Sequence, residues 1–163
     1  MSASVLEIKN LTKRFPAVLA VDRASLVVEE GKVHSIVGGN GAGKSTLVKM
    51  LAGVYPHNSY EGAFYLDGKE CAFSTIIDAE KAGISMVPQD LNMLNEMTVA
   101  DNLVINKQIT RGGVIDQVAM LREAQKIIDD FGLNIKPNTL VKEIGIAQKQ
   151  LLVIARAMHN KVK

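Results

Sequence analysis

Nine consecutive residues at positions 38–46, GGNGAGKST, constrain this chain more than any other part of its sequence. They satisfy the pattern G-x-x-x-x-G-K-[ST] at Gly38, Gly43, Lys44 and Ser45. Glycines let consecutive backbone N–H groups curl around phosphate oxygens, the lysine reaches the β- and γ-phosphates, and the serine hydroxyl ligates Mg²⁺. A helix that begins at Ser45 would point its positive end at the same phosphates. The sequence therefore predicts a loop that binds the phosphates of a nucleotide.

The residues around this loop have the pattern that such a loop requires. A short β-rich run at 33–37 precedes it, and residues 45–52 have the apolar spacing of a helix that ends at Gly53. Further strands are expected at 5–15, 18–28, 63–66, 69–72 and 84–87, with Asp67-Gly68 as a hairpin turn. Further helices are expected at 75–82 with Ser74 as its cap, and at 99–104, 116–131 and 147–158. Strands dominate before residue 88 and helices after it, which predicts an α/β fold with two subdomains, residues 1–88 and 89–163.

The composition excludes several classes of protein. The 163 residues are 47% hydrophobic and 22% charged, as expected of one soluble globular domain. The net charge of +2 is too balanced for a typical nucleic-acid or membrane-surface binder, and the single cysteine, Cys71, excludes an internal disulfide. No apolar run approaches the roughly 18 residues of a transmembrane helix, and residues 1–15 lack the pattern of a signal peptide. The sequence therefore predicts a cytoplasmic protein.

Two classes of nucleotide-binding protein fit the sequence poorly. A GTPase needs an N-K-x-D motif that reads the base, whereas residues 106–109 read NKQI and lack the aspartate. Small-molecule kinases usually carry the phosphate loop close to the N-terminus, and here more than thirty residues precede it. The strand-rich segment before the loop therefore indicates another kind of nucleotide-binding protein.

Four segments, taken in order, resemble the ATP-binding cassette (ABC) ATPases. Phe15 resembles the aromatic residue that stacks on adenine in that family, although a plain core residue at the end of a strand is the alternative. Residues 38–46 resemble the Walker A loop, and Gln89 in the segment SMVPQD (85–90) resembles the Q-loop glutamine. The resemblance implies that this glutamine approaches Mg²⁺ and the γ-phosphate and links the catalytic core to a helical subdomain that touches membrane subunits. The segment IGIAQKQLLVIARAM (144–158) resembles the signature motif and its helix, with an ordinary amphipathic helix as the alternative.

The signature segment departs from the family's common form, L-S-G-G-Q. The positions of the serine and the second glycine read Gly145 and Ala147, while Gln148 is kept. In the family the serine hydroxyl contacts the γ-phosphate across a dimer interface, which Gly145 cannot do through a side chain. Backbone N–H groups at a helix N-terminus can still bind phosphate. The resemblance therefore implies contact with a nucleotide here, with weaker closure as one expectation.

A closer resemblance is to monosaccharide-importing ATPases of the xylose and multiple-monosaccharide type. It rests on VYPHNSYEGAFYLDGKE (54–70), GVID (113–116) and a signature that begins with Ile-Gly. Gly39 stands where these loops often carry glutamate, but that side chain is not a ligand. The resemblance implies a subunit that couples ATP hydrolysis to sugar uptake on the inner face of the cell membrane. Its implied partners are a second cassette, in tandem or from another copy, transmembrane permease subunits and, indirectly, a periplasmic or extracellular sugar-binding protein, with no nucleic acid.

The family also requires a Walker B strand, an apolar run that ends in Asp-Glu. Its aspartate holds Mg²⁺ through water, and its glutamate acts as general base. Residues 127–130, IIDD, lie in a helical pattern, and residues 27–30, VVEE, indicate a turn. We therefore expect the N-terminal piece of a first cassette, truncated before the Walker B strand, with the remainder absent. Such a piece is expected to bind nucleotide with negligible hydrolysis, and to aggregate or pair with a second copy because strand edges stay unpaired.

The residues and their expected roles follow from the motif and the resemblance together. The catalytic candidates are Lys44 and Gln89, and the candidate Mg²⁺ ligands are Ser45 and Gln89. The candidate ATP-binding residues are Phe15, Gly38, Gly39, Asn40, Gly41, Ala42, Gly43, Lys44, Ser45, Thr46, Gly145, Ala147 and Gln148. The fold implied is a P-loop NTPase core of the ABC type with an N-terminal antiparallel β subdomain and a helical subdomain. Two alternatives remain open: a non-transport ABC-type ATPase that acts on nucleic acid or ribosomes, and a short non-catalytic nucleotide-binding module.

Overall fold

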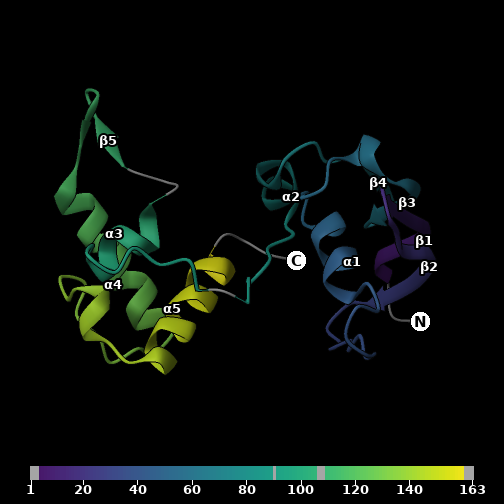
Figure 1. Cartoon of the computed structure of the whole chain (residues 1–163). Helices are drawn as coiled ribbons and strands as arrows, with labels where there is room; N and C mark the ends of the chain where they lie inside the picture. The colour runs from purple at the N-terminus through teal and green to yellow at the C-terminus, as the bar shows by residue number, and fades with distance from the viewer. Residues whose placement is uncertain (1–3, 90, 106–108, 160–163) are drawn as a thin grey trace. The chain divides into compact units, whose positions relative to one another are not determined.

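The computed structural model describes residues 4–89, 91–105 and 109–159, which divide into two compact units (Figure 1). The first unit ends at Met86 and the second begins at Val87, whereas the sequence analysis places the division after residue 88. Each unit has a hydrophobic core of its own. Among the described residues, no helix is long and apolar enough to cross a membrane.

An antiparallel sheet organises the first unit. Its strands are β1 (Ser4–Phe15), β2 (Val18–Glu29), β3 (Glu61–Leu66) and β4 (Lys69–Cys71), in the order β2-β1-β3-β4. The turn between β3 and β4 has positive φ at Asp67 (49°) and Gly68 (73°), as a two-residue type I′ hairpin turn requires. The predicted hairpin is therefore confirmed.

The sheet packs against a helix that follows the phosphate-loop motif. α1 (Lys44–Leu51), the 3-10 helix η1 (His57–Ser59) and α2 (Ile76–Ala82) are the helices of this unit. Leu47 and Met50 lie three residues apart, on one face of α1, and both are buried in the core with Ile8, Leu11 and Phe64. This packing fixes α1, and with it the end of the loop, against the sheet.

Thr75, and not the predicted Ser74, caps α2. The Thr75 hydroxyl accepts the Asp78 N–H at 3.3 Å, and Asp78 Oδ2 accepts the Thr75 N–H at 2.9 Å. This reciprocal pair is a capping box, which satisfies two backbone donors at once. The hydrogen bond from the Thr75 hydroxyl is the main reason why the pKa of Asp78 is lowered.

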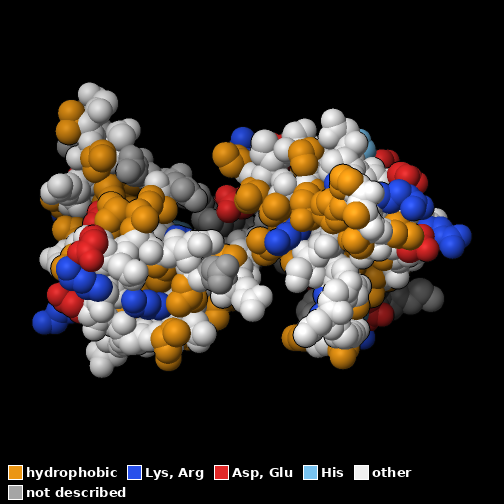
Figure 2. Space-filling view, viewed as in Figure 1, with side chains coloured by type: hydrophobic (Ala, Val, Ile, Leu, Met, Phe, Trp, Pro, Cys, Tyr) orange, Lys and Arg blue, Asp and Glu red, His pale blue; other side chains and the backbone are white. Residues whose placement is uncertain are grey.

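The predicted strands at 33–37 and 84–87 are wrong for this structure. Neither run forms a ladder among the described residues. Val33 and Val37 are 96% and 90% exposed, and Figure 2 shows hydrophobic side chains of this kind on the surface of the molecule. A strand exists only through hydrogen bonds to a neighbouring strand, so β-rich composition by itself does not create one.

Helices and one hairpin make up the second unit. Its elements are α3 (Val99–Val104), β5 (Thr110–Arg111), β6 (Val114–Ile115), α4 (Gln117–Asp130), the 3-10 helix η2 (Val141–Glu143) and α5 (Ile146–His159). The core joins α3, α4 and α5 through Val99, Ile127, Ile128 and Leu152, each at most 1% exposed. The three predicted helices are confirmed, whereas the β5–β6 hairpin was not predicted.

A buried asparagine fixes the segment that leads into α3. Asn102 is 2% exposed, and its side-chain amide donates to the carbonyl oxygens of Leu94 (3.0 Å) and Thr98 (2.9 Å). Its Oδ1 accepts the Leu94 N–H at 2.8 Å. Arg156 of α5 donates to the Asn102 carbonyl oxygen at 3.2 Å. A buried polar side chain is stable when its donors and acceptors are satisfied in this way.

The hydroxyl of Tyr60 leads to a prediction about stability. This hydroxyl is buried and has no hydrogen-bond partner among the described residues, and burial, with the charge of the nearby Cys71 at alkaline pH, raises the pKa of Tyr60. The stabilisation linked to this raised pKa is present below pH 10, the ordinary tyrosine value, and is lost as the pH rises through the folded-state value. We expect Tyr60→Phe to raise the free energy of unfolding by about 1 kcal/mol at neutral pH, because a buried unpaired donor is removed.

Denaturant unfolding at about pH 7 and about pH 10.5 measures both effects. Between about pH 7 and about pH 10.5, the free energy of unfolding should fall less for Tyr60→Phe than for the wild type. Tyr65→Phe, which removes a hydroxyl from the adjoining strand β3, is the matched control. A gain for Tyr60→Phe no larger than that for Tyr65→Phe would contradict the prediction.

Candidate nucleotide-binding site

The predicted phosphate-loop residues lie together on the surface of the first unit, between β2 and α1. Residues 38–42 are exposed, Gly43, Lys44 and Thr46 are half-buried, and Ser45 is exposed. α1 begins at Lys44, so the lysine, serine and threonine of the motif form its first turn. The motif is therefore a loop that passes directly into a helix, as phosphate binding requires.

Two glycines of the loop have left-handed backbone conformations for different reasons. Gly41 has φ of 80° and Gly43 has φ of 84°. A Cβ on Gly43 would lie 2.1 Å from the carbonyl oxygen of Ala20 and 3.2 Å from Cγ2 of Val21, both in β2. A Cβ on Gly41 would meet nothing within 4 Å. Gly43 therefore permits both the turn and a close approach to the sheet, and Gly41 permits the turn alone.

The Lys44 ammonium lies against the loop that precedes it. Its Nζ donates to the carbonyl oxygens of Gly38 and Gly39, each at 2.7 Å. α1 has no side-chain cap and no acidic residue in its first turn. The N–H groups at its start and the positive end of its dipole therefore remain available to an anion. Donors, dipole and ammonium together suit the phosphates of a nucleotide.

A divalent cation at this loop would depend on few protein ligands. Among the described residues, no group of three or more His, Cys, Asp or Glu side chains could hold a metal ion. Ser45 is exposed in the first turn of α1 and offers a hydroxyl oxygen. Mg²⁺ is commonly held by few protein oxygens together with substrate phosphates and water. The residues present therefore fit Mg²⁺ bound with a nucleotide.

Phe15 lies at the end of β1 on the same hairpin that supports the loop. It pairs with Val18 of β2, two residues before the Ala20 that Gly43 approaches. Phe15 is 37% exposed, and its ring lies 5.6 Å from the ring of Tyr55 at an angle of 68°. A ring exposed to this extent can receive a stacked base, and that role stays a prediction.

Sequence reasoning missed two residues beside Phe15. Lys13 is 6% exposed, and its Nζ lies 5.2 Å from the centre of the Phe15 ring and 4.9 Å from that of Tyr55. No alternating pattern identifies this lysine, because Leu11, Thr12 and Lys13 are all buried and the β1–β2 register shifts between Leu11 and Lys13. The contact with Tyr55 had no signal either, because Tyr55 lies far along the chain.

The other predicted site residues belong to the second unit. Gln89 is exposed and follows Pro88, while Asp90 lies outside the described residues. The structure therefore places Gln89 and the phosphate loop in different units. Gln89 and Lys44 remain candidates for a shared catalytic role.

The start of the signature segment forms a helix cap. Gly145 immediately precedes α5, and Oε1 of Gln148 accepts the Gly145 N–H at 3.1 Å. Ala147 is exposed in the first turn. A Cβ on Gly145 would meet nothing closer than Oε1 of Gln148 at 3.9 Å, so a serine would fit at this position. The structure thus brings Gly145 and Gln148 together by a capping interaction.

The segments near Gln89 and near Gly145 are hydrogen-bonded to each other. The Val141 N–H donates to the Met97 carbonyl oxygen and the Lys142 N–H to that of Asn95, each at 3.0 Å. Lys149 of α5 donates to Asn95 Oδ1 at 3.0 Å. The approach to the signature helix and the segment before α3 are therefore held as one part of the second unit.

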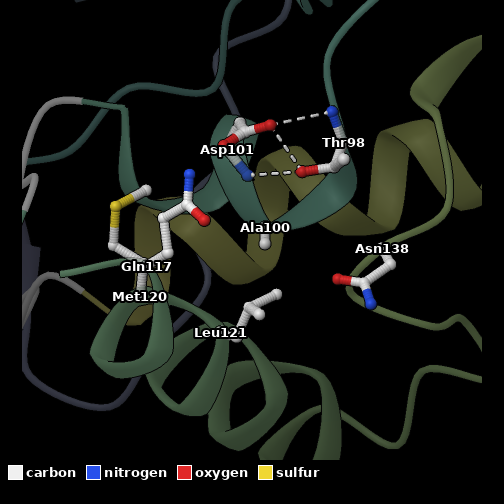
Figure 3. Close-up of a pocket in the computed structure, with 7 residues that line it drawn as sticks. All are labelled: Thr98, Ala100, Asp101, Gln117, Met120, Leu121 and Asn138. Atoms are coloured by element: carbon white, nitrogen blue, oxygen red, sulfur yellow. Dashed lines mark hydrogen bonds between the residues drawn. The ribbon is translucent and has the colours of Figure 1, made fainter. Parts of the chain in front are cut away.

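A pocket of about 190 Å³ in the second unit is not a nucleotide site. It lies between α3 and α4, with an apolar wall that includes Ala100, Met120 and Leu121 (Figure 3). Among the described residues that line it, Asp101 is the only charged one, and this carboxylate accepts the Thr98 hydroxyl at 2.6 Å and the Thr98 N–H at 3.1 Å. Ligand pockets usually measure roughly 300–1,000 Å³. The size and the engaged carboxylate both argue against a nucleotide here.

Comparison with known proteins adds independent information. The family model described as ABC transporter matches residues 21–163. The chain is 44% identical over its full length, and over 32% of the relative, to the xylose import ATP-binding protein XylG of Geobacillus kaustophilus. It is 42% identical, over 98% of its own length and 31% of the relative, to XylG of Escherichia coli O6:K15:H31. The chain therefore spans about a third of the length of these relatives.

Two solved structures have folds similar to that of this chain. A nucleotide-free ATP-binding cassette from an ABC transporter gives a TM-score of 0.80 and 27% identity, covering 96% of this chain and 65% of that one. The ADP conformation of MJ1267, an ATP-binding cassette of an ABC transporter, gives a TM-score of 0.77 and 27% identity, covering 98% and 66%. These likenesses confirm the predicted fold class.

Two alanine substitutions separate the packing role of Gly43 from its backbone role. Gly41→Ala should cost about 1 kcal/mol of unfolding free energy, because it forces a side chain into a left-handed conformation. Gly43→Ala should cost at least about 1 kcal/mol more, because the new Cβ also meets the Ala20 carbonyl. Denaturant unfolding of both variants checks this. Equal losses would show that the approach to β2 is not a constraint.

Proposed function

Because this chain belongs to the ABC transporter family, we propose that it binds ATP at residues 38–46 as the ATP-binding part of a monosaccharide importer. Family membership rests on the match over residues 21–163. Sugar import is supported by relatives that are named xylose import ATP-binding proteins, at 44% and 39% identity over the whole chain. The proposal assigns to this chain the part of such an importer that holds the nucleotide.

The start of α1 is the observation that carries ATP binding. It combines an uncapped helix N-terminus, left-handed glycines at 41 and 43, and the Lys44 ammonium held at 2.7 Å from two loop carbonyls. Phosphate oxygens carry full charges, so they form stronger hydrogen bonds with an ammonium than carbonyl oxygens do. Lys44 would therefore exchange its carbonyl contacts for the β- and γ-phosphates, while the N–H groups of the loop bind the same oxygens.

The other candidate residues have separate roles in the proposal. Phe15 would stack on adenine at the end of β1, and the Ser45 hydroxyl would hold Mg²⁺. When bound, Mg²⁺ would supply positive charge that neutralises the phosphates. Gln89 orients groups near the γ-phosphate, so that Lys44 and Gln89 act on one nucleotide. Gly145, Ala147 and Gln148 face the nucleotide of a second cassette, and the backbone N–H groups that begin α5 replace the missing serine hydroxyl.

The proposal assigns no ATP hydrolysis to this chain alone. Among the described residues, the acidic pairs that follow apolar runs lie at the end of β2 and at the end of α4. Glu29 forms an ion pair with Lys32, and Asp129 accepts a hydrogen bond from Gln125 at 2.8 Å. The first pair lies at the opposite end of β2 from Ala20, which Gly43 approaches, and the second pair ends a helix of the second unit. This chain therefore binds ATP with negligible hydrolysis.

The proposed partners are those of an importer. They are a second cassette, transmembrane permease subunits and, through the permease, a sugar-binding protein, with the chain on the inner face of the membrane. The import names of the relatives favour this assignment over an ATPase that acts on nucleic acid or ribosomes, and over a non-catalytic module.

Calorimetric titration with Mg²⁺-ATP tests the binding proposal. Lys44→Ala should lower the affinity for ATP by about 10- to 100-fold, because a hydrogen bond between charged groups contributes about 1.5–3 kcal/mol. Lys49→Ala is the matched control, since Lys49 lies in the last turn of the same helix. That variant should bind within about twofold of the wild type.

Phosphate release measured on the same samples tests the second half of the proposal. Release should stay at background for the wild type and both variants. Release well above background that disappears in Lys44→Ala would overturn binding without turnover. Equal affinities for the wild type and Lys44→Ala would overturn the binding site itself.

A further inference from the structure

A buried lysine lies between two aromatic rings at the edge of the proposed base site. Lys13 is 6% exposed, and its ammonium lies 4.9 Å from the centre of the Tyr55 ring and 5.2 Å from that of Phe15. The two rings meet edge to face, with their centres 5.6 Å apart. The Lys13 Nζ also donates to the Ser59 carbonyl oxygen at 2.6 Å. These contacts join the end of β1 to the segment that includes Tyr55 and η1.

This arrangement needs a reason, because burying an ammonium is costly unless it is paired. Within the part of the chain that the structure describes, no carboxylate forms an ion pair with Lys13. The faces of the two rings and one carbonyl oxygen receive the charge instead, and such cation–π contacts strengthen when they are shielded from water. Lys9, earlier on β1, makes a similar contact with Tyr65 at 4.7 Å but also forms an ion pair with Glu7. Lys13 therefore depends on its rings in a way that Lys9 does not.

The register of the hairpin connects this cluster to the phosphate loop. Lys13 pairs across the β1–β2 ladder with Val21. Val21 is one of the two β2 residues that approach Gly43. A Cβ placed on Gly43 would lie 3.2 Å from Cγ2 of Val21. The register therefore places the Lys13 cluster and the β2 residues that approach the phosphate loop on the same hairpin. Phe15, at 37% exposed, is the member of the cluster with the ring surface to receive a base.

From these contacts we infer that Lys13 is a positioning residue that, with Tyr55, holds the Phe15 ring as the platform for the purine of the nucleotide. The inference rests on the proposed ATP binding and goes beyond it, because neither residue is in the phosphate-binding motif. Lys13 acts through the ring and not on the phosphates. Its ammonium makes cation–π contacts with the Phe15 and Tyr55 rings at the same time, and these contacts fix the edge-to-face arrangement of the two rings. Loss of the ammonium frees the Phe15 ring to turn and weakens base stacking.

The test compares a ligand that has a base with one that has none. Calorimetric titrations of the whole chain use Mg²⁺-ATP and inorganic tripolyphosphate with Mg²⁺. Phe15→Leu should weaken ATP binding by about 5- to 100-fold, the range of one base stacked on an aromatic ring, and leave tripolyphosphate within about twofold. Lys13→Met should weaken ATP binding by at least about fivefold, again with tripolyphosphate unchanged. Lys13→Arg, which keeps a cation over both rings, should restore ATP affinity to within about twofold.

The double variant separates positioning from an independent effect. Phe15→Leu combined with Lys13→Met should bind ATP no more weakly than Phe15→Leu alone, because Lys13 acts only through that ring. Lys9→Met is the matched control, and its affinity for ATP should not change. Tyr55→Leu provides a second route if Lys13→Met does not fold, and it should lower ATP affinity while tripolyphosphate binding stays the same.

Four results would overturn the inference. The first three are equal loss of both ligands in Lys13→Met or Tyr55→Leu, unchanged ATP binding in these variants, and a double variant in which the two losses multiply. An unchanged affinity for ATP in Phe15→Leu would show that the Phe15 ring is not the platform for the base, and this result would overturn the inference as well. Each of these leaves the phosphate site standing as long as Lys44→Ala weakens both ligands, whereas indifference to Lys44→Ala would overturn the proposed ATP binding itself.

Discussion

The close approach of Gly43 to the Ala20 carbonyl oxygen is the constraint on which the rest of the site depends. It leaves no room for a side chain, so it fixes the start of α1 at one distance from β2. Leu47 and Met50 then anchor the same helix in the core of the first unit. The first-turn N–H groups are therefore held in place before any ligand arrives. Preorganised donors of this kind bind an anion without the cost of ordering the loop.

In the second unit, hydrogen bonds hold the signature segment to the residues that precede α3. The strip that follows Gln89 is bonded through Asn95 and Met97 to the residues that lead into α5, and Arg156 of α5 is bonded to Asn102 of α3. Two of these hydrogen bonds join backbone groups, and the other two run from the Lys149 side chain to the Asn95 side chain and from the Arg156 side chain to the Asn102 carbonyl oxygen. The structure thus gives a physical link between two motifs that lie far apart in the sequence.

Most predictions that depended on local sequence agree with the structure, although Ser74 is not the cap of α2, whereas two of the predicted strands lack the partner strand that they needed. The phosphate loop, the Asp67-Gly68 turn and the helices follow from neighbours a few residues away, so their patterns identified them. The strands at 33–37 and 84–87 needed a partner strand, which no pattern within those runs could supply. The Lys13 contact with Tyr55 joins segments that only the folded sheet brings together. The sequence could have predicted the Thr75 cap, because Asp78 lies three residues after it, at the position of the second residue of a capping box.

The failed strand at 33–37 also shows how the loop is stabilised. On one side the loop continues into α1, but on the other it continues into residues whose valines are exposed and whose backbone joins no ladder among the described residues. On this second side, Lys44 donates to the Gly38 and Gly39 carbonyl oxygens, and the Ala42 N–H donates to the Gly39 carbonyl oxygen. A triphosphate that takes over this lysine would also bind the N–H groups of the loop, and it would do so only in the folded chain. By mass action such a ligand must stabilise the first unit.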